Sequence, residues 1–300
     1  MHTTETTAGK DTGSLVLIQE GFVWDAQDAY LFDIDGTLLR SRDRIHFNSF
    51  AASIQQVTGL EVSLNGVVLH GGTDTAILRE AFELSGIPVE AWEPQVEAIL
   101  DVMREMVVSR RGEMDLWTMP AVAETLAHLA ERGALLGLAT GNLEVIGWAK
   151  VEEVGLREWF HFGGFSDRYS VRSEMVADAA AQARELLLSH PSHKNNGVAK
   201  VGHPARELLL SHPERDTAAP RMGHPDFSGG GVEASVCVVG DTPRDIEAAR
   251  ANRLPVIAVA TGNYSFDELA ALEPEVCASS LAALMAETVA GYSETNGVRP

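Results

Sequence analysis

Short apolar runs that alternate with amphipathic helical segments constrain the fold of this chain more than any other feature. Four such runs, at residues 29–34, 135–140, 235–240 and 255–260, are apolar at nearly every position rather than at every second one. A strand of that composition is buried on both faces, as in a parallel sheet covered by helices. The sequence therefore predicts an α/β fold with a doubly wound parallel sheet.

A block with helical periodicity interrupts this alternation between about residues 47 and 108. Its apolar residues recur at spacings of three and four, which is typical of amphipathic helices. Gly59 and Gly86 follow two of these segments and are the expected helix ends. We interpret residues 42–115 as an inserted α-helical cap domain, and residues 15–41 and 116–290 as the α/β catalytic core.

Three segments lie outside this plan. Residues 1–14 are polar and are expected to form a disordered tail, and residues 291–300 are expected to form a C-terminal tail. The sequence ARELLLSHP occurs at residues 183–191 and again at 205–213, which indicates a local duplication. It makes residues 190–232 a long insertion that we expect to be disordered, and its role stays open.

Charge and composition exclude several classes of partner. The net charge is −20 and no basic stripe offsets it, which argues against a nucleic-acid partner. No stretch approaches the roughly 20 apolar residues of a membrane span, and the first residues lack the apolar segment of a secretory signal. A cytoplasmic monomer or homodimer is the resulting expectation. An anionic substrate would need a metal ion or an arginine to offset the charge.

Polar side chains with related chemistry follow three of the predicted strands. They are Asp33 and Asp35 after the first, Thr140, Gly141 and Asn142 after the second, and Asp241 and Asp245 after the third. In a doubly wound sheet, ligands bind where the strands end at their carboxyl edge. A basic candidate, Arg172, lies between the second and third groups at the start of a helix. Each motif alone is explained by an acidic turn or a helix start, but their joint occurrence favours a site.

Phosphoryl transfer accounts for this set of groups, because it needs an in-line nucleophile, a cation and a proton donor for the leaving alcohol. Asp33 is the candidate nucleophile, and Asp35 is the candidate general acid and base. Thr140 and Arg172 are expected to contact the phosphate, together with the backbone near Gly141 and with Asn142.

A magnesium ion is the expected cofactor, because its preferred ligands are carboxylate oxygens. Asp33 and Asp241 are the first candidates for its ligands. Asp245 is a further ligand or a support for one, and Asp35 completes the expected metal-binding set.

These motifs resemble those of the haloacid dehalogenase superfamily of phosphatases. FDIDGTLL at residues 32–39 resembles its first motif, LATGN at 138–142 its second, Arg172 its third, and VVGDTPRDIEAA at 238–249 its fourth. The resemblance covers about residues 30–262. It implies a Rossmann-like core with a helical cap and a magnesium-dependent phosphatase that forms an aspartyl-phosphate on Asp33. It also implies that Asp35 is the acid and base.

The expected cap resembles that of phosphoglycolate phosphatase-like members at one loop, Gly71-Gly72-Thr73-Asp74, for which a simple turn between helices is the alternative. Such a cap closes over the site and excludes water. The residues expected to choose the substrate are Arg44, His46, Thr73, Asp74 and Arg79.

Three functions follow from these patterns. The first is a phosphatase for a small phosphorylated metabolite, with a phosphoglycolate-like ester among the candidates. The second is a phosphosugar mutase similar to β-phosphoglucomutase, because His46 lies one residue away from where such mutases carry a cap-hinge histidine. The third is a catalytically silent binding protein of the same fold, against which the complete set of acids argues. The sequence does not name the substrate.

Overall fold

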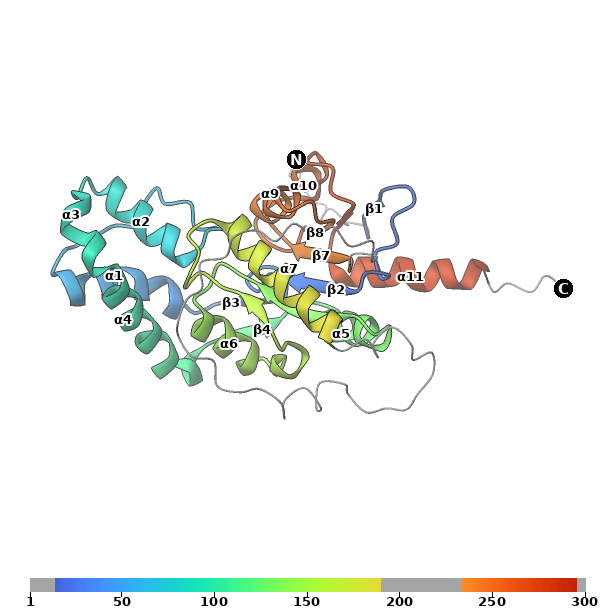
Figure 1. The fold of residues 1–300 in the computed structure, drawn as a ribbon, viewed down its shortest axis with the longest axis horizontal. Helices are drawn as coiled ribbons and strands as arrows, with labels where there is room; N and C mark the ends of the chain where they lie inside the picture. The colour runs from blue at the N-terminus through green and yellow to red at the C-terminus, as the bar shows by residue number, and fades with distance from the viewer. Residues whose placement is uncertain (1–13, 190–233, 296–300) are drawn as a thin grey trace, which may run out of the picture.

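The core of the protein is a doubly wound sheet, as predicted (Figure 1). The computed structural model describes residues 14–189 and 234–295, so the predictions for residues 1–13, 190–232 and 296–300 lie outside the described residues. The strands are β1 (Val16–Ile18), β2 (Ala29–Phe32), β5 (Leu135–Ala139), β6 (Gly163–Gly164), β7 (Val236–Gly240), β8 (Val256–Val259) and β9 (Val276–Ala278). Their order is β1-β9-β8-β7-β2-β5-β6, and only β1 runs antiparallel to its neighbour.

Both faces of the sheet are covered, which explains the apolar composition of its strands. In the central strand β2, Tyr30 and Phe32 pack into one apolar cluster, whereas Ala29 and Leu31 pack into another. The first cluster takes side chains from α5 (Val122–Glu131), α6 (Glu144–Glu153) and α11 (Leu281–Thr295). The second takes them from α7 (Arg172–Ser189), α9 (Pro243–Ala251) and α10 (Phe266–Ala270). The result is a three-layered core.

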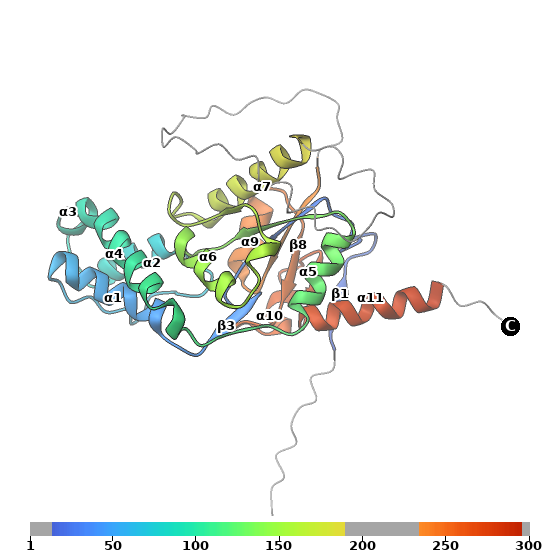
Figure 2. The ribbon, with the colours of Figure 1, turned by 90° about the horizontal axis from the view of Figure 1, so that it is seen from below.

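The last helix corrects one predicted boundary. The core was expected to end at residue 290, but α11 continues to Thr295 and projects away from the sheet (Figures 1 and 2). Gly291 lies within this helix, where a glycine costs only about 1 kcal/mol relative to alanine and does not by itself end the helix.

None of the helices in the described ranges combines the length and apolarity that a membrane span requires.

A helical unit is inserted between two short antiparallel strands, β3 (Leu39–Ser41) and β4 (Leu116–Thr118). Its helices are α1 (Ile45–Thr58), α2 (Asp74–Leu84), α3 (Val89–Trp92) and α4 (Val96–Ser109), with short 3₁₀ turns at Glu93–Gln95 and Arg111–Glu113. A further 3₁₀ turn, Arg157–Trp159, follows α6 in the core. In Figures 1 and 2 the four inserted helices lie together at one end of the molecule, beside the sheet rather than over it. We call this unit the cap.

The cap has an apolar cluster of its own, to which all four of its helices contribute. The ring of Phe82 stacks on that of Trp92 with a centroid distance of 4.9 Å and an interplanar angle of 3°. Leu143 and Ile146, at the start of α6, belong to the same cluster. The cap therefore packs against the α/β core near the carboxyl ends of the strands, where the predicted site residues lie.

Candidate active site

Three neighbouring strands bring the predicted site residues to one edge of the sheet. The strand β2 pairs in parallel with β5 on one side and with β7 on the other. Asp33, Thr140 and Asp241 each follow the last residue of one of these strands. Because parallel strands end at the same edge, the three side chains lie at a common opening.

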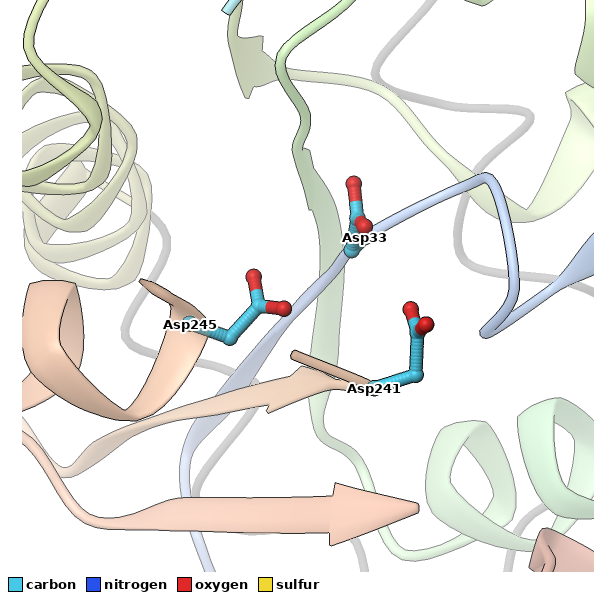
Figure 3. Close-up of side chains that lie close together, drawn as sticks. All are labelled: Asp33, Asp241 and Asp245. Atoms are coloured by element: carbon cyan, nitrogen blue, oxygen red, sulfur yellow. The ribbon is translucent and has the colours of Figure 1, made fainter. Parts of the chain in front are cut away.

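An acidic cluster occupies this edge. One carboxylate oxygen from each of Asp33, Asp241 and Asp245 lies within 4.8 Å of the others, and all three residues are buried. Figure 3 shows the three carboxylates facing a common space, Asp33 and Asp241 from the strand ends and Asp245 from α9. Burial of three like charges requires compensation by cations.

Arg172, the first residue of α7, supplies one of these cations. Its Nη2 lies 3.1 Å from Oδ1 of Asp33. Its Nε and Nη2 donate to Oδ1 of Asp245 over 3.0 and 2.6 Å, and its Nη1 donates to the carbonyl oxygen of Gly71 over 3.1 Å. The side chain is 8% exposed. Arg172 thus links two acids of the cluster to a loop of the cap.

Asp245 is held by more donors than its neighbours. Its Oδ2 accepts hydrogen bonds from the backbone N–H and the hydroxyl of Thr242, at 3.0 and 2.7 Å, which forms the capping box of α9. Its Oδ1 is occupied by Arg172. With both oxygens engaged, Asp245 orients Arg172 and supports the cluster. A metal contact from Asp245 stays a prediction.

Asp241 lies between Thr37 and Gly262. Thr37 donates to its Oδ1 over 3.0 Å. A Cβ atom on Gly262 would lie 1.7 Å from its Oδ2, so only glycine leaves room for the carboxylate there. Burial, together with repulsion from Asp33 and Asp245, raises the pKa of Asp241 well above its ordinary value.

The charges of the cluster fit a divalent cation. Burial raises the pKa of Asp33 to about 6, Arg172 opposes this rise, and Asp245 adds to it. Two of the three carboxylates contact the Arg172 guanidinium, and oxygen donors of this kind are those that Mg²⁺ prefers. Asp33 and Asp241 are the residues best placed to hold such an ion.

Asp35 lies outside the acidic cluster and is paired with a lysine. Nζ of Lys150, on α6, donates to both carboxylate oxygens of Asp35, over 2.9 Å to Oδ1 and 2.7 Å to Oδ2. Asn142 donates to Oδ2 over 2.8 Å and also to the hydroxyl of Thr140 over 2.7 Å. Desolvation raises the pKa of Asp35, but the Lys150 charge and these hydrogen bonds outweigh it and lower the pKa below its ordinary value. A metal contact from residue 35 stays a prediction.

A cavity of about 420 Å³ joins the acidic edge to the cap. Its polar end contains Asp33, Asp35, Thr140, Gly141, Asn142, Lys150, Arg172 and Asp241. Its other walls come from the cap and the β3–β4 pair and include Leu39, Phe47, Phe50, Leu69, Ile77, Met114 and Leu116, with Arg40, His46 and His70 among them. The cavity thus combines acidic and basic groups suited to a phosphate and a metal ion with further walls of mixed polar and apolar character.

The cap is docked on the core through the start of α2. The backbone N–H of Asp74 donates to the carbonyl oxygen of Gly141 over 2.7 Å. Oδ2 of Asp74 accepts from the N–H of Leu143 over 2.8 Å and lies 3.1 Å from Nε2 of His46. A Cβ on Gly141 would lie 2.0 Å from the carbonyl oxygen of Gly72, so this approach requires glycine. Substrate contacts from His46 and Asp74, which both line the cavity, stay predictions.

Three of the residues expected to choose the substrate have other roles. The buried hydroxyl of Thr73 donates to the carbonyl oxygen of Ser170 over 2.8 Å and caps α2, and Thr73 does not line the cavity. Arg44 lies over the ring of Phe47, outside the cavity lining. Arg79 pairs at the surface with Glu93. None of these three residues lines the cavity, and substrate contacts from them stay predictions.

Comparisons with known proteins match this geometry. A family model described as haloacid dehalogenase-like hydrolase matches residues 27–202, and one described as HAD-hydrolase-like matches residues 201–284. The crystal structure of a predicted phosphatase from Clostridium acetobutylicum is 18% identical, with a TM-score of 0.51, and covers 83% of this chain and 92% of its own. That of a hydrolase from Pseudomonas syringae is 15% identical, with a TM-score of 0.50, and covers 82% and 90%. Both likenesses show the fold. No curated protein matches the chain significantly.

Proposed function

This chain belongs to the haloacid dehalogenase-like hydrolase family, and from that premise we propose that it is a magnesium-dependent phosphatase for small phosphate monoesters. The observation that carries the proposal is the convergence of one carboxylate oxygen each from Asp33, Asp241 and Asp245 within 4.8 Å, with Asp33 and Asp241 lining the cavity. A buried group of acids is unfavourable unless cations share the site, and phosphoryl transfer makes use of such an arrangement.

Asp33 is the proposed nucleophile. One of its carboxylate oxygens forms a bond to phosphorus while the bond from phosphorus to the ester oxygen breaks, which gives an aspartyl-phosphate and an alcohol. The proton for the alcohol comes from Asp35, which also lines the cavity and has first taken that proton up from solvent. Arg172 supports this role because it lies 3.1 Å from Asp33 and restrains the direction of its carboxylate.

Hydrolysis of the intermediate uses the same two residues. Asp35, now ionised, takes a proton from water as the water oxygen attacks phosphorus, and the bond to Asp33 breaks to release phosphate. The pair with Lys150 supports this second step, because it favours the ionised form of Asp35. A Mg²⁺ ion held by Asp33 and Asp241 would offset the negative charge that the phosphate brings.

The cavity supports a small substrate. A volume of about 420 Å³ suits a phosphate group with a short organic part. The apolar walls favour carbon-rich groups, while Arg40 and His70 at the same walls leave room for a polar substituent. Phosphoglycolate is therefore one compound to test among several.

A cytoplasmic location and a monomeric or homodimeric state belong to the same proposal. The buried free thiols Cys237 and Cys277 fit a reducing compartment.

A screen of phosphate monoesters with Mg²⁺ tests the proposal, run beside Asp33→Asn. Asp101→Asn is a matched control, because it makes the same change on an exposed side chain of α4 away from the cavity. We expect release of inorganic phosphate by the wild type and by the control, and none by Asp33→Asn or in excess chelator. Mass spectrometry of acid-quenched protein should find the phosphoryl group on Asp33.

Two results would overturn the proposal. One is normal turnover in Asp33→Asn, which would exclude the nucleophile. The other is normal turnover in excess chelator, which would exclude the metal requirement.

A further inference from the structure

Lys150 is a second buried cation at the site, and the mechanism above assigns it no contact with the substrate. It lies on α6 with a side chain 5% exposed. Its Nζ donates to Oδ1 and Oδ2 of Asp35, over 2.9 and 2.7 Å, and to Oδ1 of Asn142 over 2.7 Å. An ammonium group has three hydrogens, so all of its donors are used within the protein.

Stability alone does not explain a lysine at this position. Desolvation of an ammonium opposes folding, and an apolar side chain of similar size often replaces a buried ion pair without loss. The partner, Asp35, has a side chain that is 44% exposed at the cavity. The pair therefore joins a buried helix position to a half-exposed acid, and its clearest effect is to fix where that acid lies.

The contacts of Lys150 form a closed ring. Asn142 accepts from Lys150 through Oδ1 and donates through Nδ2 to Oδ2 of Asp35 over 2.8 Å. The same Nδ2 donates to the hydroxyl of Thr140 over 2.7 Å. The ring connects α6 to the ends of β2 and β5, so both oxygens of Asp35 are held by side chains from these neighbouring elements.

We propose that Lys150 is a positioning residue that holds Asp35 where it meets the leaving oxygen of the phosphate ester, an inference that rests on the function proposed above. Lys150 acts through Asp35, because each of its three donors is already taken. The two acids that carry the chemistry then have one buried cation each, Arg172 for Asp33 and Lys150 for Asp35.

Esters with different leaving groups test this role. A poor leaving group, such as an alkyl alcohol, needs a proton as its bond to phosphorus breaks, whereas p-nitrophenolate leaves without one. Lys150→Met keeps the length of the side chain and removes the charge. The release of the alcohol decides kcat/KM, whereas kcat also includes hydrolysis of the intermediate, which is the same for both esters. We expect kcat/KM for an alkyl phosphate to fall about 100-fold, the low end of what a positioned acid contributes. For p-nitrophenyl phosphate we expect kcat/KM to fall by less than about 5-fold.

Two further variants separate positioning from a structural role. Val151→Ala removes buried apolar atoms from the next residue of α6 and should lower the melting temperature without changing the ratio of the two rates. The double variant Asp35→Asn/Lys150→Met should be no slower than Asp35→Asn alone, because residues that act as a unit are not additive. Equal losses for both esters in Lys150→Met, or additive losses in the double variant, would overturn the proposal.

Crystal structures of the wild type and of Lys150→Met give a readout that needs no turnover. We expect Asp35 to lose its hydrogen bond with Asn142 and to take another rotamer in the variant. If Asp35 keeps its place without Lys150, the positioning role is refuted even in an active phosphatase. If the wild type hydrolyses no phosphate ester, the proposed function fails, and the crystal comparison still decides whether Lys150 fixes Asp35.

Discussion

The guanidinium of Arg172 donates two hydrogen bonds to one carboxylate oxygen of Asp245, over 3.0 Å from Nε and 2.6 Å from Nη2. Both side chains are buried, and Asp33 lies 3.1 Å from the same guanidinium. Arg172 therefore lies between two acids of the cluster. A planar guanidinium presents its N–H donors in a fixed fork, whereas a lysine ammonium is a compact point charge.

We predict that Arg172→Met destabilises the protein by about 3–5 kcal/mol, because two buried acids lose their cation. Arg172→Lys keeps the charge but loses the paired contact, so we expect a smaller loss of stability and a fall in kcat of at least about 10-fold. Thermal unfolding in chelator and p-nitrophenyl phosphate kinetics measure the two effects. An Arg172→Met protein as stable as the wild type would contradict this view of the cluster.

Asp241→Asn should stabilise the metal-free protein in a pH-dependent way. The folded-state pKa of Asp241 is raised, so its ionisation weakens the folded state, and the loss grows as the pH rises through that pKa. Asp33, with a pKa raised to about 6 from 3.8, behaves in the same sense: its stabilising contribution is present below about pH 4 and is lost through about pH 6. We expect the melting temperature of Asp241→Asn to match the wild type near pH 4 and to exceed it at pH 7.5.

Added Mg²⁺ should reverse that order. At about 100 times its Kd, the ion contributes about 2.7 kcal/mol, which corresponds to roughly 5–10 °C for a protein of this size. We expect this rise in the wild type and in the control Asp101→Asn, and its loss in Asp241→Asn. A metal-dependent rise of equal size in Asp241→Asn would remove this residue from the metal site.

Gly141→Ala should separate the cap from the core. The added Cβ would lie 2.0 Å from the carbonyl oxygen of Gly72, so the loop before α2 must shift and the hydrogen bond from Asp74 must lengthen. A displacement near 1 Å at an active site can lower the rate about 100-fold, and we expect a fall of that order in kcat/KM. Gly112→Ala is the matched control, because nothing lies within 4 Å of its added Cβ. Equal kinetics for the two variants would show that the docked position of the cap is not needed for turnover.

Phe82→Ala should loosen the cap and leave the sheet intact. Its ring is fully buried and stacks on Trp92, and removal of such a side chain costs about 3–5 kcal/mol. We expect faster amide hydrogen exchange across α1 to α4 and unchanged exchange in β2, β5 and β7. Leu84→Ala, on the same helix but 56% exposed, should change stability by no more than about 0.5 kcal/mol. Equal protection of the cap in both variants would contradict an independent cap cluster.

The α/β fold could be predicted because its strands are apolar at nearly every position and are separated by periodic helices. The same pattern put Asp33, Thr140 and Asp241 at strand ends, and the structure brings them to one edge. The pair β3 and β4 was not predicted. Each of its strands has only three residues, too few for a periodicity to be read, and their pairing joins segments far apart in the chain.

Lys150 is the site residue that the sequence analysis missed. Nothing in the sequence distinguishes Lys150 from an ordinary lysine of a helix. Its partner Asp35 lies 115 positions away. One signal was present: Ile146, one helical turn earlier, and Val151, the next residue, are apolar and buried, so Lys150 lies near the inward face of α6. A charged residue on such a face requires a partner, and the acids at the strand ends were the available ones.

The chain crosses between core and cap only along β3 and β4, two strands that lie side by side. A whole domain can therefore be cut out or exchanged at one junction without breaking any pairing of the main sheet. Under the proposed function, exchange of the cap would change the substrate range, because cap residues form part of the cavity wall. The acids and cations that act on phosphorus would remain unchanged, and a chimaera made at residues 41 and 116 is a direct route to such an exchange.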